Sequence, residues 1–146
     1  TSGRQKVFGS VDEILTINKR VQRTIPVLNI PNIHAREGGS LREVQDFEDL
    51  FNKVEDQMKS GKFYIHFSGV DHADGDKIMG TPIKKGDLRF DPLAEMMLDH
   101  EDWEFRIISE SPLLEHDAVY MKLILDRILQ RRVQKEERQK AKEAQK

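Results

Sequence analysis

The segment "KFYIHFSG", residues 62–69, decides the fold class of this chain. Its apolar and aromatic side chains form a run of strand length, which is typical of a β-strand buried in a sheet. Patterns with helical periodicity lie on both sides of it. The segment therefore indicates one strand in an alternating series of helices and strands.

Two further segments have the same character. They are "IPVLNIPNI", residues 25–33, and "WEFRIISES", residues 103–111. Both are apolar and β-branched, so we expect all three strands to be buried on both faces. Pro31 is expected near the end of the first of them, because proline cannot donate a hydrogen bond to a sheet.

Four helices are predicted from apolar periodicity and from capping residues. Ser10 with Glu13 and Ser40 with Glu43 have the spacing of capping boxes. Asp91-Pro92 and Ser111-Pro112 are typical helix starts. The helices are expected over residues 11–22, 41–59, 91–98 and from 111 to about 133.

The resulting order, α-β-α-β-α-β-α with parallel strands, predicts an α/β fold. We expect residues 1–133 to form the domain and residues 134–146 to form a charged tail, either a solvated helical extension or a frayed end. Arg131 and Arg132, just before this tail, and the scattered lysines of the tail are candidates to contact phosphate. In parallel sheets, function gathers where the strands end, here from about Asn32, His66 and Glu110.

Composition excludes several classes of protein. The 146 residues carry 24 lysines and arginines against 26 acidic residues, so no global basic field favours nucleic acid. The absence of cysteine excludes thiolate sites and disulfides. No apolar run reaches the length of a membrane span, and a cytoplasmic protein is expected. Phosphate-binding glycine loops and serine elbows are also missing.

Two residues at strand ends are candidate catalytic residues and metal ligands, His66 and Glu110. A carboxylate after the buried run "FRIIS" is costly unless it is paired or binds a cation, so Glu110 is either a site residue or part of an ion pair. His66 is either a ligand or a histidine satisfied by its neighbours. His34 and Arg36 are either substrate-binding residues or a turn with a surface salt bridge.

The polar segment 71–76 lacks the closing glutamate of a calcium loop and is predicted to be a solvated loop. His72 within it is a candidate accessory residue, as are His34, Asn29 and Asn32.

Four segments together resemble the archaeal branch of the endonuclease IV family: "NIHAREGG" (32–39), "FYIHFSGV" (63–70), "IKKGDLRFDPL" (83–93) and "IISESPLLEHDAVYMKLIL" (107–125). These AP endonucleases are (β/α)8 TIM barrels related to xylose isomerase-like and sugar-phosphate isomerase-like barrels. The resemblance implies that residues 1–133 form the C-terminal half of such a barrel.

The resemblance also implies zinc-dependent phosphodiester cleavage at abasic DNA sites. His66 and Glu110 match metal ligands of the family. Asn29, Asn32 and Gly80 stand where the family has other ligands, so a reduced number of zinc sites is expected, with manganese as an alternative metal.

DNA is the partner implied by the resemblance. A missing N-terminal barrel half or a second chain is expected to cover the exposed strands, and the chain alone is expected to be inactive. The alternatives are a non-catalytic barrel that binds nucleic acid or a protein, and a sugar-phosphate isomerase-like enzyme.

Overall fold

The computed structural model describes residues 1–144, and this part of the chain forms two sheets and five helices. The helices are α1 (Val11–Arg20), α2 (Ile30–Arg36), α3 (Val44–Met58), α4 (Phe90–Asp99) and α5 (Glu115–Glu143). The strands are β1 (Val27–Asn29), β2 (Lys62–Phe67), β3 (Gly69–Ala73), β4 (Asp76–Thr81) and β5 (Glu104–Ser109).

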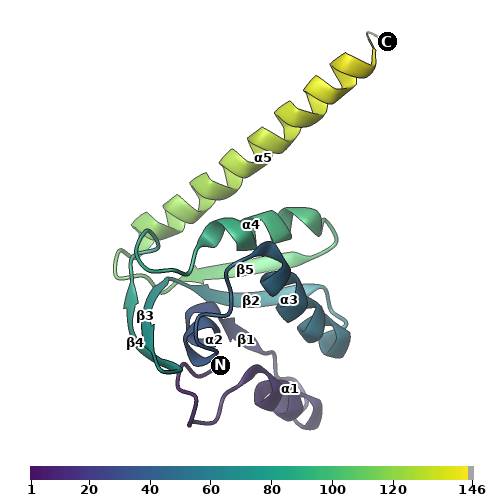
Figure 1. The fold of residues 1–146 in the computed structure, drawn as a ribbon. Helices are drawn as coiled ribbons and strands as arrows, with labels where there is room; N and C mark the ends of the chain where they lie inside the picture. The colour runs from purple at the N-terminus through teal and green to yellow at the C-terminus, as the bar shows by residue number, and fades with distance from the viewer. Residues whose placement is uncertain (145–146) are drawn as a thin grey trace.

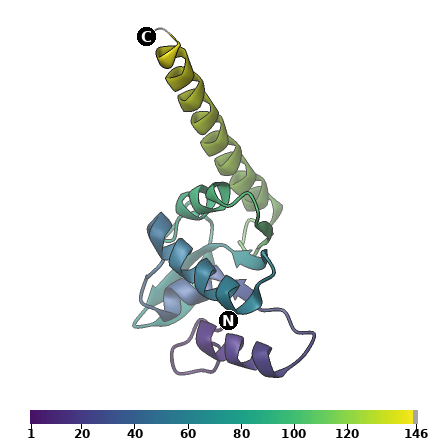
Figure 2. The same cartoon turned by 90° about the vertical axis from the view of Figure 1, so that its right-hand side faces the viewer.

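A three-stranded parallel sheet lies at the centre of the fold, in the order β1-β2-β5 (Figure 1). Helices lie in the connections between its strands, α2 and α3 between β1 and β2 and α4 between β2 and β5, because parallel strands need crossover connections. The predicted alternation and strand direction are therefore confirmed for these elements. In Figure 2 the helices α3 and α4 lie side by side, on the same side of the sheet.

The core lies on one face of this sheet. Phe63, Ile65 and Phe67 of β2 are buried against the helices. Phe63 meets Phe51 of α3 with ring centroids 5.0 Å apart, and Phe67 meets Phe90 of α4 at 5.1 Å. These aromatic contacts fix α3 and α4 over the same face.

The other face of the sheet is open. Tyr64 and His66 alternate with the buried residues of β2 and are only partly buried, and Ile108 of β5 is 59% exposed. The expectation that the strands are buried on both faces is therefore wrong. The helices cover one face only, so period-2 alternation governs the burial of β2.

Strand β1 is much shorter than the predicted strand 25–33. It ends at Asn29, whose side chain accepts a hydrogen bond from the backbone N–H of Asn32 (3.1 Å) and so caps α2. Pro31 lies in the first turn of α2, where its missing N–H is harmless. The cap and the proline together explain why the chain turns into a helix here.

The segment predicted to be a solvated loop forms an antiparallel hairpin instead, β3-β4, which packs on α2. Asp74 and Gly75 have φ values of 52° and 79°, as a two-residue type I′ turn demands. The dipeptide Asp-Gly is a strong signal for this turn, and it explains why the prediction for residues 71–76 is wrong.

Helix α5 begins later and runs further than predicted. Ser111 does not open it. The Ser111 hydroxyl instead donates to the buried carboxylate of Asp117, which also accepts a hydrogen bond from the backbone N–H of Ile83 (2.8 Å). At its other end α5 continues to Glu143 and projects from the body of the protein (Figure 1). No helix within residues 1–144 is long and apolar enough to cross a membrane.

The predicted fold class, the C-terminal half of a (β/α)8 TIM barrel, is wrong as stated. The chain is a small α/β domain that combines a three-stranded parallel sheet with a separate antiparallel hairpin. Strands β1 and β5 are edges of the parallel sheet within the described residues, because each pairs only with β2. What covers these edges and the open face stays a prediction.

Candidate functional site

The carboxyl ends of the three parallel strands bring Asn29, His66 and Glu110 together. Asn29 of β1 lies opposite His66 of β2 in the sheet register. Glu110 follows β5 directly and continues its pairing, because its backbone N–H donates to the carbonyl of Phe67 (2.9 Å). Parallel strands end at one edge, so residues far apart in the sequence meet there.

The side chains of these residues form a hydrogen-bonded row. The Nδ1 atom of His66 lies 2.5 Å from Oε1 of Glu110, and Asn29 Nδ2 donates to Oε2 of Glu110 (2.6 Å). About a third of each side chain of His66 and Glu110 is exposed, 30% and 33%. Glu110 thus has a partner on each oxygen, while Nε2 of His66 makes no hydrogen bond within residues 1–144.

The two amides have structural tasks as well. The Oδ1 atom of Asn29 caps α2, and Nδ2 of Asn32 donates to the carbonyl of Thr1 (3.0 Å). Both side chains therefore hold the backbone around the site. An amide is also a poor zinc ligand, so neither residue replaces the carboxylate or imidazole that the resemblance leads one to expect there.

The row does not fit a metal bound jointly by His66 and Glu110. Two ligand atoms about 2.0 Å from a zinc ion lie roughly 3 Å or more apart. The distance between Nδ1 and Oε1 is shorter than that, so in this arrangement the two side chains bond each other. Nε2 of His66 is the donor atom that this arrangement leaves for other uses.

A second cluster joins His34 of α2, His72 of β3 and Asp87, which lies between β4 and α4. The Nε2 atoms of His34 and His72 lie 3.1 and 3.2 Å from Oδ1 of Asp87. The guanidinium of Arg42 donates to Oδ2 of Asp87 (2.5 Å). The rings of His34 and His72 meet edge to face, with centroids 5.0 Å apart.

The environment shifts the pKa of two members of this cluster. Burial raises the pKa of Asp87, but hydrogen bonds and charge interactions with His34, and the hydrogen bond from His72, outweigh it and lower the pKa to about 2. Burial lowers the pKa of His34 despite the neighbouring carboxylate. Asp87 is therefore ionised at neutral pH and accepts hydrogen bonds from three side chains.

The cluster has the size of a metal site, because ligand atoms of His34, His72 and Asp87 lie within 4.8 Å of one another. Its hydrogen bonds argue against that use. The backbone N–H of Leu41 donates to Nδ1 of His34 (3.1 Å), so the proton of the neutral ring is on Nε2, the atom that faces Asp87. Together with the Arg42 cation, this arrangement favours a structural tie between α2, β3 and the Asp87 loop.

Arg36 and His34 were predicted to bind substrate, and the structure places both in internal contacts. The guanidinium of Arg36 donates to the carbonyls of Arg4, of Gln5 (3.0 Å) and of Val7 (2.7 Å), and its side chain is 12% exposed. His34 is fully buried. Arg36 thus holds the N-terminal loop, and its substrate-binding role stays a prediction.

Asp87, Arg42 and Asp117 are not among the predicted site residues. Asp87 and Asp117 lie within the segments 83–93 and 107–125 that carry the resemblance, yet neither ends a predicted strand. Asp87 is 53 residues from His34 in the sequence, and no spacing rule links them. Asp117 follows Glu115 and His116 in the polar start of α5, so no sequence pattern distinguishes it from its exposed neighbours.

Comparisons with known proteins give one informative match. The chain is 28% identical to an uncharacterized protein of Methanocaldococcus jannaschii over 126 residues, which cover 83% of this chain and 45% of that protein. The chain thus spans less than half the length of this relative. No family model matches the chain, and no solved structure does. The predicted half-barrel therefore has no matching barrel structure, and the resemblance to endonuclease IV stays a proposal.

Proposed function

We propose that His66 and Glu110 form the proton-transfer dyad of an enzyme that cleaves phosphodiester bonds at abasic sites in DNA. The observation that carries the proposal is the 2.5 Å contact between Nδ1 of His66 and Oε1 of Glu110 at the carboxyl edge of the sheet. The substrate class comes from the resemblance to endonuclease IV. The chemistry comes from the side chains of this chain.

The contact determines which nitrogen of His66 can accept a proton. An ionised carboxylate only accepts hydrogen bonds, so the ring proton of neutral His66 lies on Nδ1. Nε2 then carries the lone pair on a partly exposed side chain. A histidine held in this way can remove the proton of an attacking water, which is the role of an oriented general base.

Asn29 supports the dyad from the other side. Its amide donates to the second oxygen of Glu110, and its position is fixed because its Oδ1 atom caps α2. The carboxylate is therefore held at both oxygens and keeps the imidazole in one orientation. This arrangement needs no metal ion between His66 and Glu110, and zinc or manganese would need ligands beyond Nε2 of His66.

The second candidate function is binding without chemistry. It is favoured by Asn29 and Asn32, whose amides stand where the resemblance implies metal ligands and already make internal hydrogen bonds. The surface at the sheet edge would then bind nucleic acid or a protein and leave it intact.

An incision assay on a duplex with one abasic site separates the two functions. The sample is the 146-residue chain. We expect slow incision, with kcat lowered about 10²–10⁴-fold by His66→Gln. His116→Gln is the matched control, since His116 is exposed and lies on α5. Binding without incision, with and without added zinc or manganese, would overturn the catalytic proposal in favour of the second function.

A further inference from the structure

The outer half of α5 is a feature that the proposed function does not use. Beyond Arg132 the helix makes no packing contact with the core, and its residues as far as Glu143 are exposed. A helical segment of this length is marginal in water on its own. Its sequence of lysine, arginine, glutamine, glutamate and alanine has high helix propensity, which sustains it past the body of the protein.

The face that α5 turns toward the core changes character along the helix. Ile124 and Ile128 are buried on this face. Continuing it at 100° per residue brings four cations onto the same side: Arg131, Lys135, Arg138 and Lys142. We call these four residues the basic stripe. They follow one another at spacings of four, three and four residues, so they lie within one narrow arc of the helix.

The basic stripe is not neutralised by the protein. None of its four side chains forms an ion pair within residues 1–144. The acidic residues of the same segment, Glu136, Glu137 and Glu143, point to other sides of the helix by the same periodicity. Cations are therefore segregated on one face, in a chain whose formal net charge is −2.

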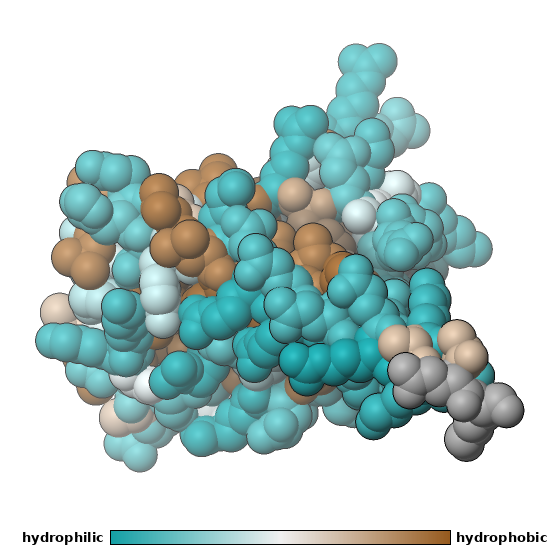
Figure 3. Space-filling view, turned by 90° about the horizontal axis from the view of Figure 1, so that it is seen from above, coloured by the Kyte–Doolittle hydropathy of each residue, from teal (hydrophilic) through white to brown (hydrophobic). Residues whose placement is uncertain are grey.

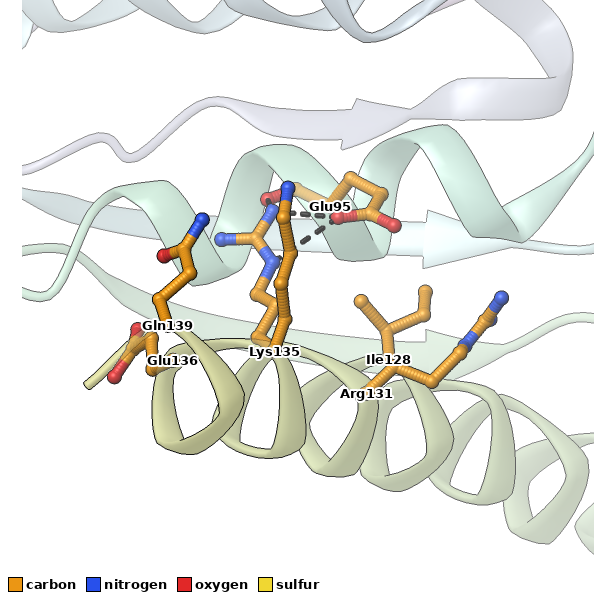
Figure 4. A pocket seen from close by; sticks show the side chains of 7 residues that line it. Glu95, Ile128, Arg131, Lys135, Glu136 and Gln139 are labelled. Atoms are coloured by element: carbon orange, nitrogen blue, oxygen red, sulfur yellow. Dashed lines mark hydrogen bonds and ion pairs between the residues drawn. The ribbon is translucent and has the colours of Figure 1, made fainter. Parts of the chain in front are cut away.

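The groove beside the stripe is wide and hydrophilic. Between α4 and α5 lies a hollow of about 540 Å³, lined by Glu95, Arg131 and Lys135 among others (Figure 4). A second hollow of about 460 Å³ continues outward along the stripe. Seen from above, the surface toward the C-terminal end is mostly hydrophilic, and the apolar side chains gather elsewhere (Figure 3).

The neighbouring Arg132 explains why the stripe is available. Its guanidinium binds Glu95 Oε2 (2.5 Å) and Asp99 Oδ1 (2.5 Å), so it offsets part of the acidic charge of α4 next to the groove. It also donates to the carbonyl of Glu95 (3.0 Å), and the residues of α5 beyond it are exposed. Arg132 therefore ties α5 to α4 and engages the neighbouring carboxylates, so the four side chains of the basic stripe lie along the two hollows without an ion pair in the described residues.

We propose that the basic stripe of α5 binds the phosphate backbone of a nucleic acid without sequence preference. The four cations extend over about 16 Å of helix, which corresponds to roughly five phosphates of one DNA strand. A row without apolar or acidic members does not suit the core of a protein–protein interface, where charges are depleted. This surface lies away from His66 and Glu110, so it stands independently of the proposed function.

Fluorescence anisotropy with labelled single- and double-stranded DNA of mixed sequence tests the proposal. With four phosphate contacts, we expect the affinity to fall on the order of a hundredfold when salt rises fourfold. The variant Arg138→Gln/Lys142→Gln should lower the slope of log K against log salt by about 2. Circular dichroism of the variant checks that α5 stays helical.

The matched control is Lys19→Gln/Lys140→Gln, which removes the same charge from exposed positions off the stripe. An unchanged slope in this control, together with a reduced slope in the stripe variant, supports the proposal. Equal slopes in both variants, or no binding of either DNA at low salt, would overturn it. Binding of an acidic peptide in place of DNA would overturn it in favour of a protein partner.

Discussion

His66 and Glu110 lie side chain to side chain at the ends of adjacent strands, with 2.5 Å between Nδ1 and Oε1. The register of β2 and β5 brings the two residues close together. Phe67 pairs with Ser109, His66 directly precedes Phe67, and Glu110 directly follows Ser109. The sheet thus positions a histidine and a carboxylate that are 44 residues apart in the sequence. The contact controls which nitrogen of His66 is protonated, and that state can be measured.

Glu110→Gln should reverse the tautomer of His66. The Gln oxygen is expected to face Asn29 Nδ2, which needs an acceptor, and the Gln NH₂ then faces His66. Nδ1 of His66 becomes an acceptor, and the ring proton moves to Nε2. Nitrogen-15 NMR of the histidine rings distinguishes the two tautomers, with exposed His116 as the internal reference. The same tautomer in both proteins would contradict this assignment.

Asn29→Asp and Gly80→His together should create a metal site, because they introduce ligand side chains at the positions where the resemblance implies them. Asn29→Asp brings a carboxylate against Glu110, which we expect to destabilise the fold by about 1–3 kcal/mol in the absence of a cation. Gly80→His adds a ligand next to the site, since a Cβ atom there would lie 3.9 Å from the carbonyl oxygen of Glu110. In the double variant Asn29→Asp/Gly80→His, manganese or zinc should raise the midpoint temperature of thermal unfolding.

The control for the metal site is Asn52→Asp, which places a carboxylate beside Glu48 at an exposed position of α3. It should show little change with or without metal. A double variant whose midpoint does not respond to either ion would show that the sheet edge cannot be converted into a metal site by these two residues.

Stability should fall in acid because of Asp87 and His34. The pKa of Asp87 is lowered to about 2, mainly by His34 and His72 against the effect of burial, so the unfolded chain binds this proton first as pH drops below about 4. Burial also lowers the pKa of His34, so the unfolded state gains a proton below about 6.5 that the native state resists. Both effects remove stability as pH falls.

Urea unfolding at a series of pH values measures this loss. Because a third of the Asp87 side chain is exposed, its share between pH 4 and 2 should be only on the order of 1 kcal/mol. The variant Asp87→Asn should be less stable at neutral pH. Its free energy of unfolding should also fall less steeply than that of wild type between pH 4 and 2. Asp71→Asn, at an exposed position, should fall as steeply as wild type. Parallel curves for wild type and Asp87→Asn would refute the assignment.

Gly86→Ala and Gly38→Ala should differ although both glycines have positive φ, 82° and 67°. A Cβ atom at Gly86 would lie 2.8 Å from the carbonyl oxygen of Val70, whereas nothing lies within 4 Å at Gly38. Backbone strain acts in both variants, and the steric clash only in the first. We expect Gly86→Ala to lose about 1–3 kcal/mol more, as measured by urea unfolding.

Local patterns predicted only part of the local structure, because α3 is capped by Glu43 with Asp46 and not by Ser40 with Glu43. The capping box of Ser10 and Glu13 forms as expected, with Glu13 Oε2 accepting from the backbone N–H of Ser10 (2.8 Å). The three parallel strands also follow from their apolar runs. The hairpin was not predicted, because its short strands carry the polar residues Asp71, His72 and Lys77 and show no apolar alternation. Among these polar residues, the Asp-Gly turn is hard to distinguish from a loop.

The candidate site was predictable only in part. His66 and Glu110 end predicted strands, and parallel pairing then places them at one edge. Asp87 belongs to no strand, and its contacts with His34 and Arg42 depend on how α2 and the loop before α4 meet in space. Sequence spacing contains no information on such contacts. The open face of the sheet was equally unpredictable from the sequence, because an apolar run does not show which of its residues are covered by helices.

Arg132→Gln should release the outer half of α5 while leaving the body intact. The variant loses the ion pairs with Glu95 and Asp99 and the hydrogen bond to the Glu95 carbonyl. Since these groups are partly exposed, we expect a loss of about 1 kcal/mol in the free energy of unfolding. Amide hydrogen exchange should accelerate beyond Ile128 and stay unchanged in β2. Arg131→Gln, one residue away and without an ion pair in the described residues, should leave exchange as in wild type. Equal acceleration in both variants would mean that the helix frays regardless of this anchor.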